Sequence, residues 1–161
     1  MTGLFYSDVF LQHDTGYGHP ERPERLQALA ESFAQRPVDN IERIEIDTPA
    51  PVEAIARVHQ RQHIEKVQAS CLNALQHLDG DTVVSARSYE AALLAAGAGL
   101  AAADAVIAGE LSNAFCAVRP PGHHAEVDRA MGFCLFNNVA VVAQHLKAVH
   151  EVQRIFVLDW D

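Results

Sequence analysis

Two adjacent histidines in a rigid loop are the first residues whose types suit catalysis. His123 and His124 end the run RPPGHH at residues 119–124, in which two prolines restrict the backbone and Gly122 permits a sharp turn. An imidazole with an ordinary pKa of about 6.5 becomes an acid or a base after a small shift. The loop therefore suits general acid–base chemistry. The alternative is a pair of histidines that lies on a surface loop and has no catalytic role.

Two aspartates near residue 160 provide a second possible site. Asp159 and Asp161 close the mostly apolar run 154–161 and are two residues apart, so in a strand both would project from one face. Close carboxylates repel each other unless a cation or hydrogen-bond donors compensate, so the pair is compatible with a metal site. A strand end that frays into solvent, with aspartate as a turn residue, is the alternative.

A glycine–aromatic turn lies between the two sites in the sequence. Gly132 and Phe133 precede Asn137 and a predicted helix, and such a turn can present a backbone carbonyl and an aromatic face to a ligand. The alternative is a helix entry in which Asn137 is the N-cap and Phe133 belongs to the core. Cys134 has no base partner nearby in the sequence, and we interpret it as a packing residue.

The elements that must position these residues alternate between strands and helices. Strands are predicted over 4–6, 41–46, 114–118 and 154–159, and helices over 23–35, 51–58, 62–78, 87–107 and 138–149. This order predicts a single α/β domain over residues 1–161, with helices on both faces of a mostly parallel sheet in three layers. Ligands bind at the carboxyl ends of the strands in such sheets, where the histidine loop and the two aspartates fall.

Two other patterns are interpreted as structural. Gly97 and Gly99 imitate a dinucleotide-binding fingerprint, but they lie inside an alanine-rich helix, where small residues allow close packing against a neighbour. His59 and His63 have the i, i+4 spacing of a helical metal pair without the glutamate of the known motif, so we expect structural histidines.

Composition limits the possible partners and compartments. The 161 residues include 12 Lys and Arg and 21 Asp and Glu, a net charge of −9 that argues against nucleic-acid binding. An acidic surface suits a cationic substrate or serves solubility alone. Three cysteines without C-x-x-C spacing favour a reducing compartment, the cytoplasm. No leader pattern and no apolar run of about 18 residues is recognised, so no membrane contact is expected.

The motifs together resemble the catalytic core of the zinc-dependent deacetylases, the family of histone deacetylases and acetylpolyamine amidohydrolases. The resemblance rests on the order and spacing of RPPGHHA at 119–125, GFC at 132–134 and VLDWD at 157–161. Upstream, HPERPERL at 19–26 is similar to the family's N-terminal motif, and Asp81-Thr82 with SYEAA at 88–92 resembles its bacterial and class II-like branch. The resemblance implies an arginase-like fold and hydrolysis of an N-acetyl amide on a lysine or a polyamine.

The resemblance also implies roles for individual residues. His123 and His124 match the tandem histidines that activate water, and one of them protonates the departing amine. Asp161 matches a zinc-binding carboxylate, and Asp159 matches the acid that orients the first histidine and helps to bind a structural potassium ion.

Four further residues match positions around the substrate and product. Gly132 and Phe133 match the lining of the tunnel for the acyl-lysine stem. Asp81 matches a rim acid that holds the substrate backbone, and Arg22 matches an arginine near an internal acetate exit.

In the family, a histidine ligand, a further aspartate ligand and a transition-state tyrosine follow the position of Asp161. A catalytic zinc normally has three protein ligands, so the 161-residue chain is expected to be the inactive N-terminal portion of a longer enzyme. An exposed apolar strand edge would then favour oligomerisation. Two other functions stay open at this point: a non-catalytic remnant that acts as a binding or assembly module, and a related manganese ureohydrolase.

Overall fold

Three parallel strands form the centre of the computed structural model, which describes residues 1–72 and 76–161. The strands are β1 (Thr2–Tyr6), β2 (Ile41–Glu45) and β5 (Asn113–Cys116), in the order β2-β1-β5. Alternation along β1 directs Leu4 and Tyr6 to one face and Phe5 to the other, and all three side chains are buried. Burial on both faces is what a central parallel strand requires.

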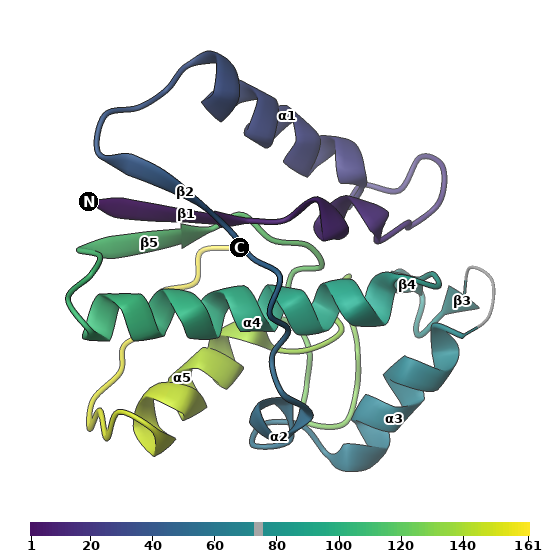
Figure 1. The fold of residues 1–161 in the computed structure, drawn as a ribbon. Helices are drawn as coiled ribbons and strands as arrows, with labels where there is room; N and C mark the ends of the chain where they lie inside the picture. Colours follow the sequence, from purple (N-terminus) through teal and green to yellow (C-terminus); the bar gives the residue numbers. More distant parts are fainter. Residues whose placement is uncertain (73–75) are drawn as a thin grey trace.

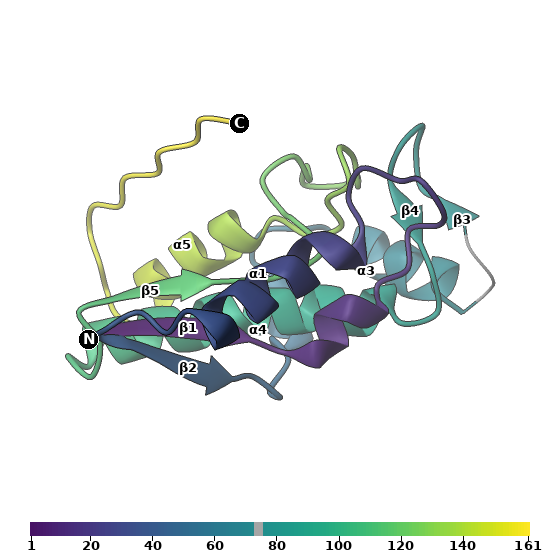
Figure 2. The same ribbon diagram turned by 90° about the horizontal axis from the view of Figure 1, so that it is seen from above.

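Helices cover both faces of this sheet, which confirms the predicted α/β class (Figures 1 and 2). Helix α1 (Pro23–Gln35) lies on one side, and α4 (Ser88–Ile107) lies on the other, with α5 (Asn138–Ala148) beneath it. Helix α1 begins as predicted with Pro23 at its first position, where the missing N–H has no helical partner to lose. Helix α4 is buried between the sheet and α5.

The strand order places a topological switch point beside β1. The chain passes from β1 through α1 to β2 on one side, and later through α4 to β5 on the other side of β1. Between two strands whose connections leave in opposite directions, the loops at the carboxyl ends separate and leave a crevice. The histidine loop follows β5 directly, so the fold places it at this crevice.

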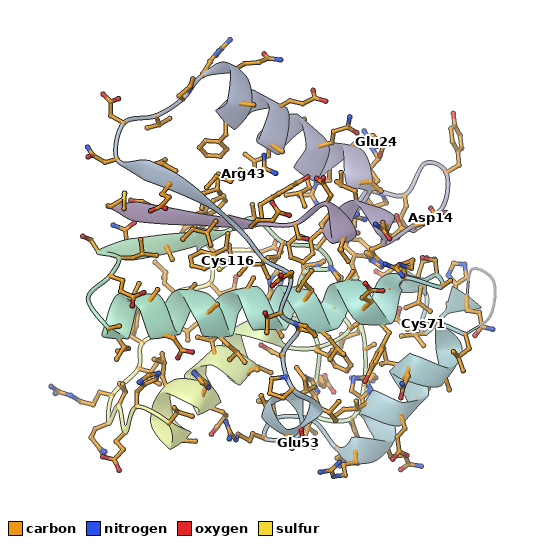
Figure 3. All side chains as sticks on the ribbon, viewed as in Figure 1. Asp14, Glu24, Arg43, Glu53, Cys71 and Cys116 are labelled. Carbon is orange, nitrogen blue, oxygen red and sulfur yellow. The ribbon has the colours of Figure 1, made fainter. Side chains whose placement is uncertain are left out.

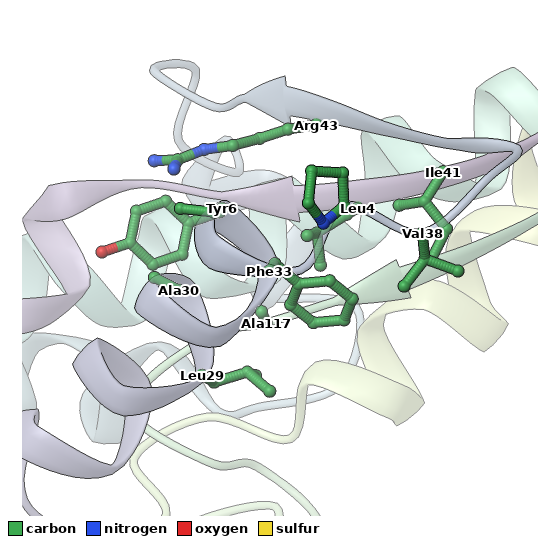
Figure 4. A pocket seen from close by; sticks show the side chains of 11 residues that line it. Leu4, Tyr6, Leu29, Ala30, Phe33, Val38, Ile41, Arg43 and Ala117 are labelled. Carbon is green, nitrogen blue, oxygen red and sulfur yellow. The ribbon is translucent and has the colours of Figure 1, made fainter.

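Helix α1 leaves part of the sheet face uncovered. A cavity of about 330 Å³ lies between α1 and the strands, lined on the helix by Leu29, Ala30 and Phe33 and on the sheet by Leu4 and Tyr6 (Figure 4). Small alanine side chains on this face of α1 do not fill the space above the sheet.

Helix α4 is a core helix with the length and composition of a membrane span. Its 20 residues are apolar enough to cross a bilayer, contrary to the expectation from the sequence, and half of its most apolar window is buried within the protein. The predicted close packing is confirmed. A Cβ on Gly97 would collide with the backbone of Thr48 and Ala50, and a Cβ on Gly99 would lie 2.6 Å from the Val142 side chain of α5.

Several predicted elements are shorter than expected, and others were missed. Helix α2 spans Val52–Ile55 and α3 spans Arg61–Ser70, so the predicted helix over 62–78 ends early; its part over 73–75 lies outside the described residues. Neither the 3-10 helix η1 (Asp8–Gln12) nor the short antiparallel pair of β3 (Gln76–His77) and β4 (Val83–Val84) was predicted from the sequence. Hairpins this short contain too few residues to show a period of two.

The predicted strand over 154–159 is wrong for this structure. The segment is an extended trace outside the sheet (Figure 2), and Phe156, Val157 and Leu158 are 86%, 53% and 67% exposed. A β-strand is defined by its backbone hydrogen bonds to a neighbouring strand, and this segment forms no such pairing with the described residues. It borders an apolar groove of about 750 Å³ whose other walls are α4, α5 and β5.

The three cysteines are free, as the sequence indicated. Figure 3 shows Cys71 and Cys116 in separate parts of the fold, one at the end of α3 and one on β5 facing α4. Burial raises the pKa of the Cys134 thiol to about 11, so this side chain is a neutral packing residue rather than a nucleophile.

The two glycines of α4 should respond differently to substitution. We expect Gly97→Ala to lower the free energy of unfolding by about 1–2 kcal/mol, because a methyl group there meets backbone that cannot move alone. Gly99→Ala should be neutral or stabilising by up to about 1 kcal/mol, because helix propensity improves and only the Val142 side chain must shift. Urea unfolding measures both, and equal effects would contradict the close backbone approach.

Candidate catalytic site

A buried arginine joins the loops that follow β1 and β5. Arg119 pairs with Glu21 through Nε, and its Nη2 donates to Glu21 Oε2 at 2.7 Å. Nη1 donates to the backbone oxygen of Phe10 at 2.8 Å, and Nη2 also donates to that of His13 at 3.0 Å. Both side chains of the pair are almost fully buried, so four hydrogen bonds compensate for the desolvation of the two charges.

His13 completes this buried network as a neutral group. Its Nδ1 lies 2.6 Å from Ser88 Oγ at the start of α4. Burial, and then the nearby positive charge of Arg119, lower the pKa of His13 to about 3. The 3.6 Å approach of its Nε2 to Glu21 is therefore not an ion pair at neutral pH.

The histidine loop is held against the start of α5. A Cβ on Gly122 would lie 2.5 Å from Asn138 N and 2.7 Å from Phe136 O, so only glycine allows this close contact. Asn137 donates through Nδ2 to the carbonyl oxygens of His123 and Ala125 at 3.3 and 3.1 Å. Its Oδ1 accepts from Ala140 N at 3.0 Å, which confirms the predicted N-cap.

His59 and His63 are structural histidines, as predicted. Asn137 N donates to His59 Nε2 at 2.9 Å, and His63 Nε2 lies 2.9 Å from Leu135 O. Burial lowers the pKa of His59 to about 4 and lowers that of His63 as well. Two neutral imidazoles thus fix the backbone on which Asn137 holds the histidine loop.

The glycine–aromatic turn lies directly beside the histidine loop. Gly132 has φ +56°, and a Cβ there would lie 2.6 Å from Cδ2 of the His124 ring. Phe133 also has a positive φ, 68°, which a non-glycine residue seldom adopts and which is found preferentially at functional sites. The conformation turns the Phe133 ring toward His19, with ring centroids 4.9 Å apart in an edge arrangement.

Asp81 belongs to the same surface. Phe133 N donates to Thr82 Oγ1 at 3.1 Å, and His19 Nε2 lies 3.0 Å from Asp81 O. The Asp81 side chain is itself exposed and accepts from Thr82 Oγ1 at 3.3 Å. The structure thus brings Asp81, Gly132 and Phe133 to one side of the histidines.

His123, His124 and Asp161 converge on one point. His123 Nε2 lies 2.9 Å and His124 Nε2 4.0 Å from Asp161 Oδ2, and the two rings meet edge to face with centroids 4.1 Å apart. The ligand atoms of the three residues lie within 4.8 Å of one another. His123 Nε2 is buried, and apart from this close contact with Asp161, which lacks hydrogen-bond geometry, it has no hydrogen-bond partner among the residues that the structure describes.

This donor set fits a divalent metal with a water beside it. A buried imidazole nitrogen without a hydrogen bond and an adjacent carboxylate are what such a water or ion would satisfy. The side chains of His123, His124 and Asp161 are 27%, 47% and 70% exposed, so the point where they converge is open to solvent.

Two predicted site residues are placed elsewhere. Asp159 Oδ1 accepts from Asp161 N at 3.1 Å, and within residues 1–72 and 76–161 no ion pair joins Asp159 to either histidine. The Arg22 side chain is 52% exposed and lies 3.8 Å from Glu24, at the surface. The second arginine of the same motif, Arg25, instead lines a pocket of about 250 Å³ with Glu21 and Arg119.

Sequence reasoning missed Arg25, His13 and the buried role of Arg119. The motif HPERPERL contains both arginines, and the sequence prediction named Arg22; in the structure Arg22 precedes the helix that begins at Pro23, and Arg25 lies inside it. His13 gave no signal, because its partner Ser88 is 75 residues away.

Comparison with known proteins gives consistent matches. The histone deacetylase domain family matches residues 19–161. A histone deacetylase-like amidohydrolase of Pseudomonas aeruginosa is 40% identical over 94% of this chain and 40% of its own length. The polyamine deacetylase HDAC10 of Homo sapiens is 40% identical over 88% of this chain and 22% of its own length.

A solved structure agrees with the sequence matches. The crystal structure of the HDA15 HD domain superposes with a TM-score of 0.85 and 36% identity, covering 91% of this chain and 43% of that one. The uncharacterized protein slr0245 of Synechocystis is 39% identical over this whole chain and 54% of its own length. The chain thus spans about half or less of the length of these relatives.

The buried histidines predict a loss of stability in acid. Between pH 6.5 and about 3 the unfolded chain protonates His13 and the folded chain does not, so the free energy of unfolding falls as pH falls. At about pH 4.5 the neutral His13 should make the free energy of unfolding about 2–3 kcal/mol lower than at pH 7. Urea unfolding of the wild type and His13→Gln checks this: the variant should depend less on pH, and an unchanged dependence would contradict the neutral buried state. The exposed His77→Gln is the matched control.

The buried ion pair predicts a large effect of removing one charge. Glu21→Gln should lower the free energy of unfolding by about 3–5 kcal/mol, because Arg119 would stay buried with its charge uncompensated. Glu24→Gln, in the exposed pair with Arg22, should change it by less than about 1 kcal/mol. Urea unfolding compares the two, and similar costs would refute the central role of the buried pair.

Proposed function

This chain belongs to the histone deacetylase domain family, and on that premise we propose that it forms the N-terminal part of the catalytic domain of a zinc-dependent amidohydrolase that removes acetyl groups. The convergence of His123 Nε2, His124 Nε2 and Asp161 Oδ2 on one point carries the proposal. Since the chain spans about half or less of its relatives, the activity is proposed for a polypeptide of their length.

In this proposal the two histidines handle the protons. Both Nε2 atoms face the point beside Asp161, so a water molecule there lies within reach of both rings. One imidazole takes a proton from the water as it attacks the amide carbonyl, and one returns a proton to the departing amine nitrogen. Asn137, through its hydrogen bond to His123 O, and Gly132, through its contact with His124, keep the rings in position.

Asp161 would be one ligand of the zinc ion, with further ligands from the remainder of the polypeptide. When bound, zinc polarises an amide oxygen and lowers the pKa of a bound water. Asp159 would orient the first histidine and share a potassium ion only if the segment 154–161 adopts a different arrangement, since its present contact is with Asp161 N.

The substrate class follows from the surface beside the histidines. Phe133 offers an aromatic face that can cover the methylenes of a lysine or polyamine stem, and the exposed Asp81 carboxylate lies on the same side. A cationic substrate suits the net charge of −9. One relative is itself a polyamine deacetylase, which supports a small cationic substrate as well as acetyl-lysine.

A product path would run past Arg25 rather than Arg22. The pocket of about 250 Å³ that Arg25 lines also contacts Arg119 and Pro121, at the base of the histidine loop. A guanidinium beside such a pocket suits an acetate ion.

The two alternative functions, a manganese ureohydrolase and a non-catalytic binding module, are supported by different observations. The family match argues against the manganese ureohydrolase, since the matched family is the deacetylase one. A non-catalytic binding module is supported by the solvent exposure of His124 and Asp161, which leaves the site open. Measurement of turnover decides between hydrolase and binding module.

Acetate release from an acetyl-lysine peptide and from an acetylated polyamine tests the proposal. The polypeptide of the relatives' length should turn over in a zinc-dependent way, whereas the 161-residue chain alone should not. His123→Ala and His124→Ala should each lower kcat by about 10²–10⁴-fold, because a proton-transfer group is removed. The control His77→Ala should retain the wild-type rate. Full activity in both histidine variants, or zinc-loaded protein without turnover, would refute the hydrolase.

A further inference from the structure

A second cluster of metal-ligating side chains lies away from the catalytic site. Asp104 is on α4, His145 is on the last turn of α5, and His150 follows α5. Figure 1 shows the C-terminal ends of α4 and α5 on the same side of the molecule, at the end of the sheet where the strands begin. The histidine loop follows the opposite end of β5, so the two clusters are separate.

The three side chains are aimed at one another. His145 Nε2 and His150 Nε2 each lie 2.6 Å from the same oxygen, Asp104 Oδ1, and the ring centroids are 5.4 Å apart. All three ligand atoms lie within 4.8 Å of one another. The imidazoles are 12% and 22% exposed and Asp104 is 50% exposed, so an ion could enter from the side of the carboxylate.

We propose that Asp104, His145 and His150 form a peripheral site for a divalent transition metal of the zinc class. Two imidazole nitrogens and one carboxylate oxygen favour zinc, cobalt or nickel over calcium or magnesium, which require mostly oxygen ligands. Around a tetrahedral ion with ligands at about 2.1 Å, neighbouring donor atoms are about 3.4 Å apart. Widening each 2.6 Å contact to that distance requires only small side-chain rotations, and water completes the fourth position.

Binding there would fix the turn that leads out of α5. Val149 N bonds to His145 O at 2.8 Å, Val152 N bonds to Leu146 O at 3.1 Å, and Glu151 has φ 57°. This turn directs the chain into the segment that carries Asp159 and Asp161. A metal held by α4, by α5 and by the turn itself would tie all three together. The proposal depends only on these residues and not on the proposed function.

Metal titration of the chelator-treated 161-residue chain tests the site. A common background of His123→Ala with His124→Ala removes the catalytic cluster. In it, Co²⁺ should bind at about one ion per chain with visible absorption typical of tetrahedral coordination. Asp104→Asn and His150→Ala should each weaken binding by about tenfold or more. His77→Ala, an exposed histidine outside both clusters, is the matched control and should bind as the background does.

A second measurement decides the matter even where a ligand variant folds poorly. In the background chain, whose peripheral residues are all unchanged, Zn²⁺ should perturb the imidazole NMR signals of His145 and His150 and leave that of His77 in place. Zn²⁺ should also raise Tm by several degrees. Absence of stoichiometric binding, signal changes confined to other histidines, or equal affinity in the Asp104→Asn and His150→Ala variants would overturn the proposal.

Discussion

The buried pair of Arg119 and Glu21 is the constraint on which the arrangement of the site depends. It joins Arg119, three residues beyond the end of β5, to the loop between β1 and α1, across 98 positions of the sequence. A buried arginine needs acceptors for its N–H groups, and the carbonyls of Phe10 and His13 accept two hydrogen bonds beside those to Glu21. Leaving any of these buried groups without a partner would cost free energy. The loop that carries Glu21 and the loop that carries Arg119 are therefore held in one position relative to each other. That position sets where Pro120 and the histidines begin.

Neutral side chains and backbone contacts then position the rest of the histidine loop relative to Arg119. Gly122 lies against the first residues of α5, Asn137 holds the carbonyl of His123, and His59 holds Asn137 in turn. Charged groups at these positions would act electrostatically on His123 and His124, and neutral histidines avoid this. Burial keeps the pKa of His59 at about 4, so the supporting imidazole is uncharged at neutral pH.

The parts of the fold that the sequence could predict are those determined by local patterns. Helix α1 was predicted to the residue because Pro23 marks its start, and the histidine loop was located because prolines and glycine restrict it. The partners of His13, Arg119, His145 and His150 could not be predicted, because each contact joins residues at least 41 positions apart. Sequence alone also could not show that Arg25 lines the pocket beside Arg119 while Arg22 is exposed, since the two lie on either side of a helix start.

The segment 154–161 shows why a pattern alone does not make a strand. Its apolar residues have the composition of a buried parallel strand, but pairing requires a neighbour that offers free backbone groups at the right spacing. The outer side of β5 offers such an edge, and an apolar groove lies between them. Asp161 reaches His123 from this unpaired segment, so its carboxylate is held by few contacts, while the loop that carries the histidines is held by Asn137 and by the close approach of Gly122 to α5. Any ion bound by Asp161 must order that segment as well, and the entropy lost in ordering it reduces the affinity. Pairing the segment with β5 beforehand would remove that cost, so the metal affinity of the site and the completeness of the sheet are coupled.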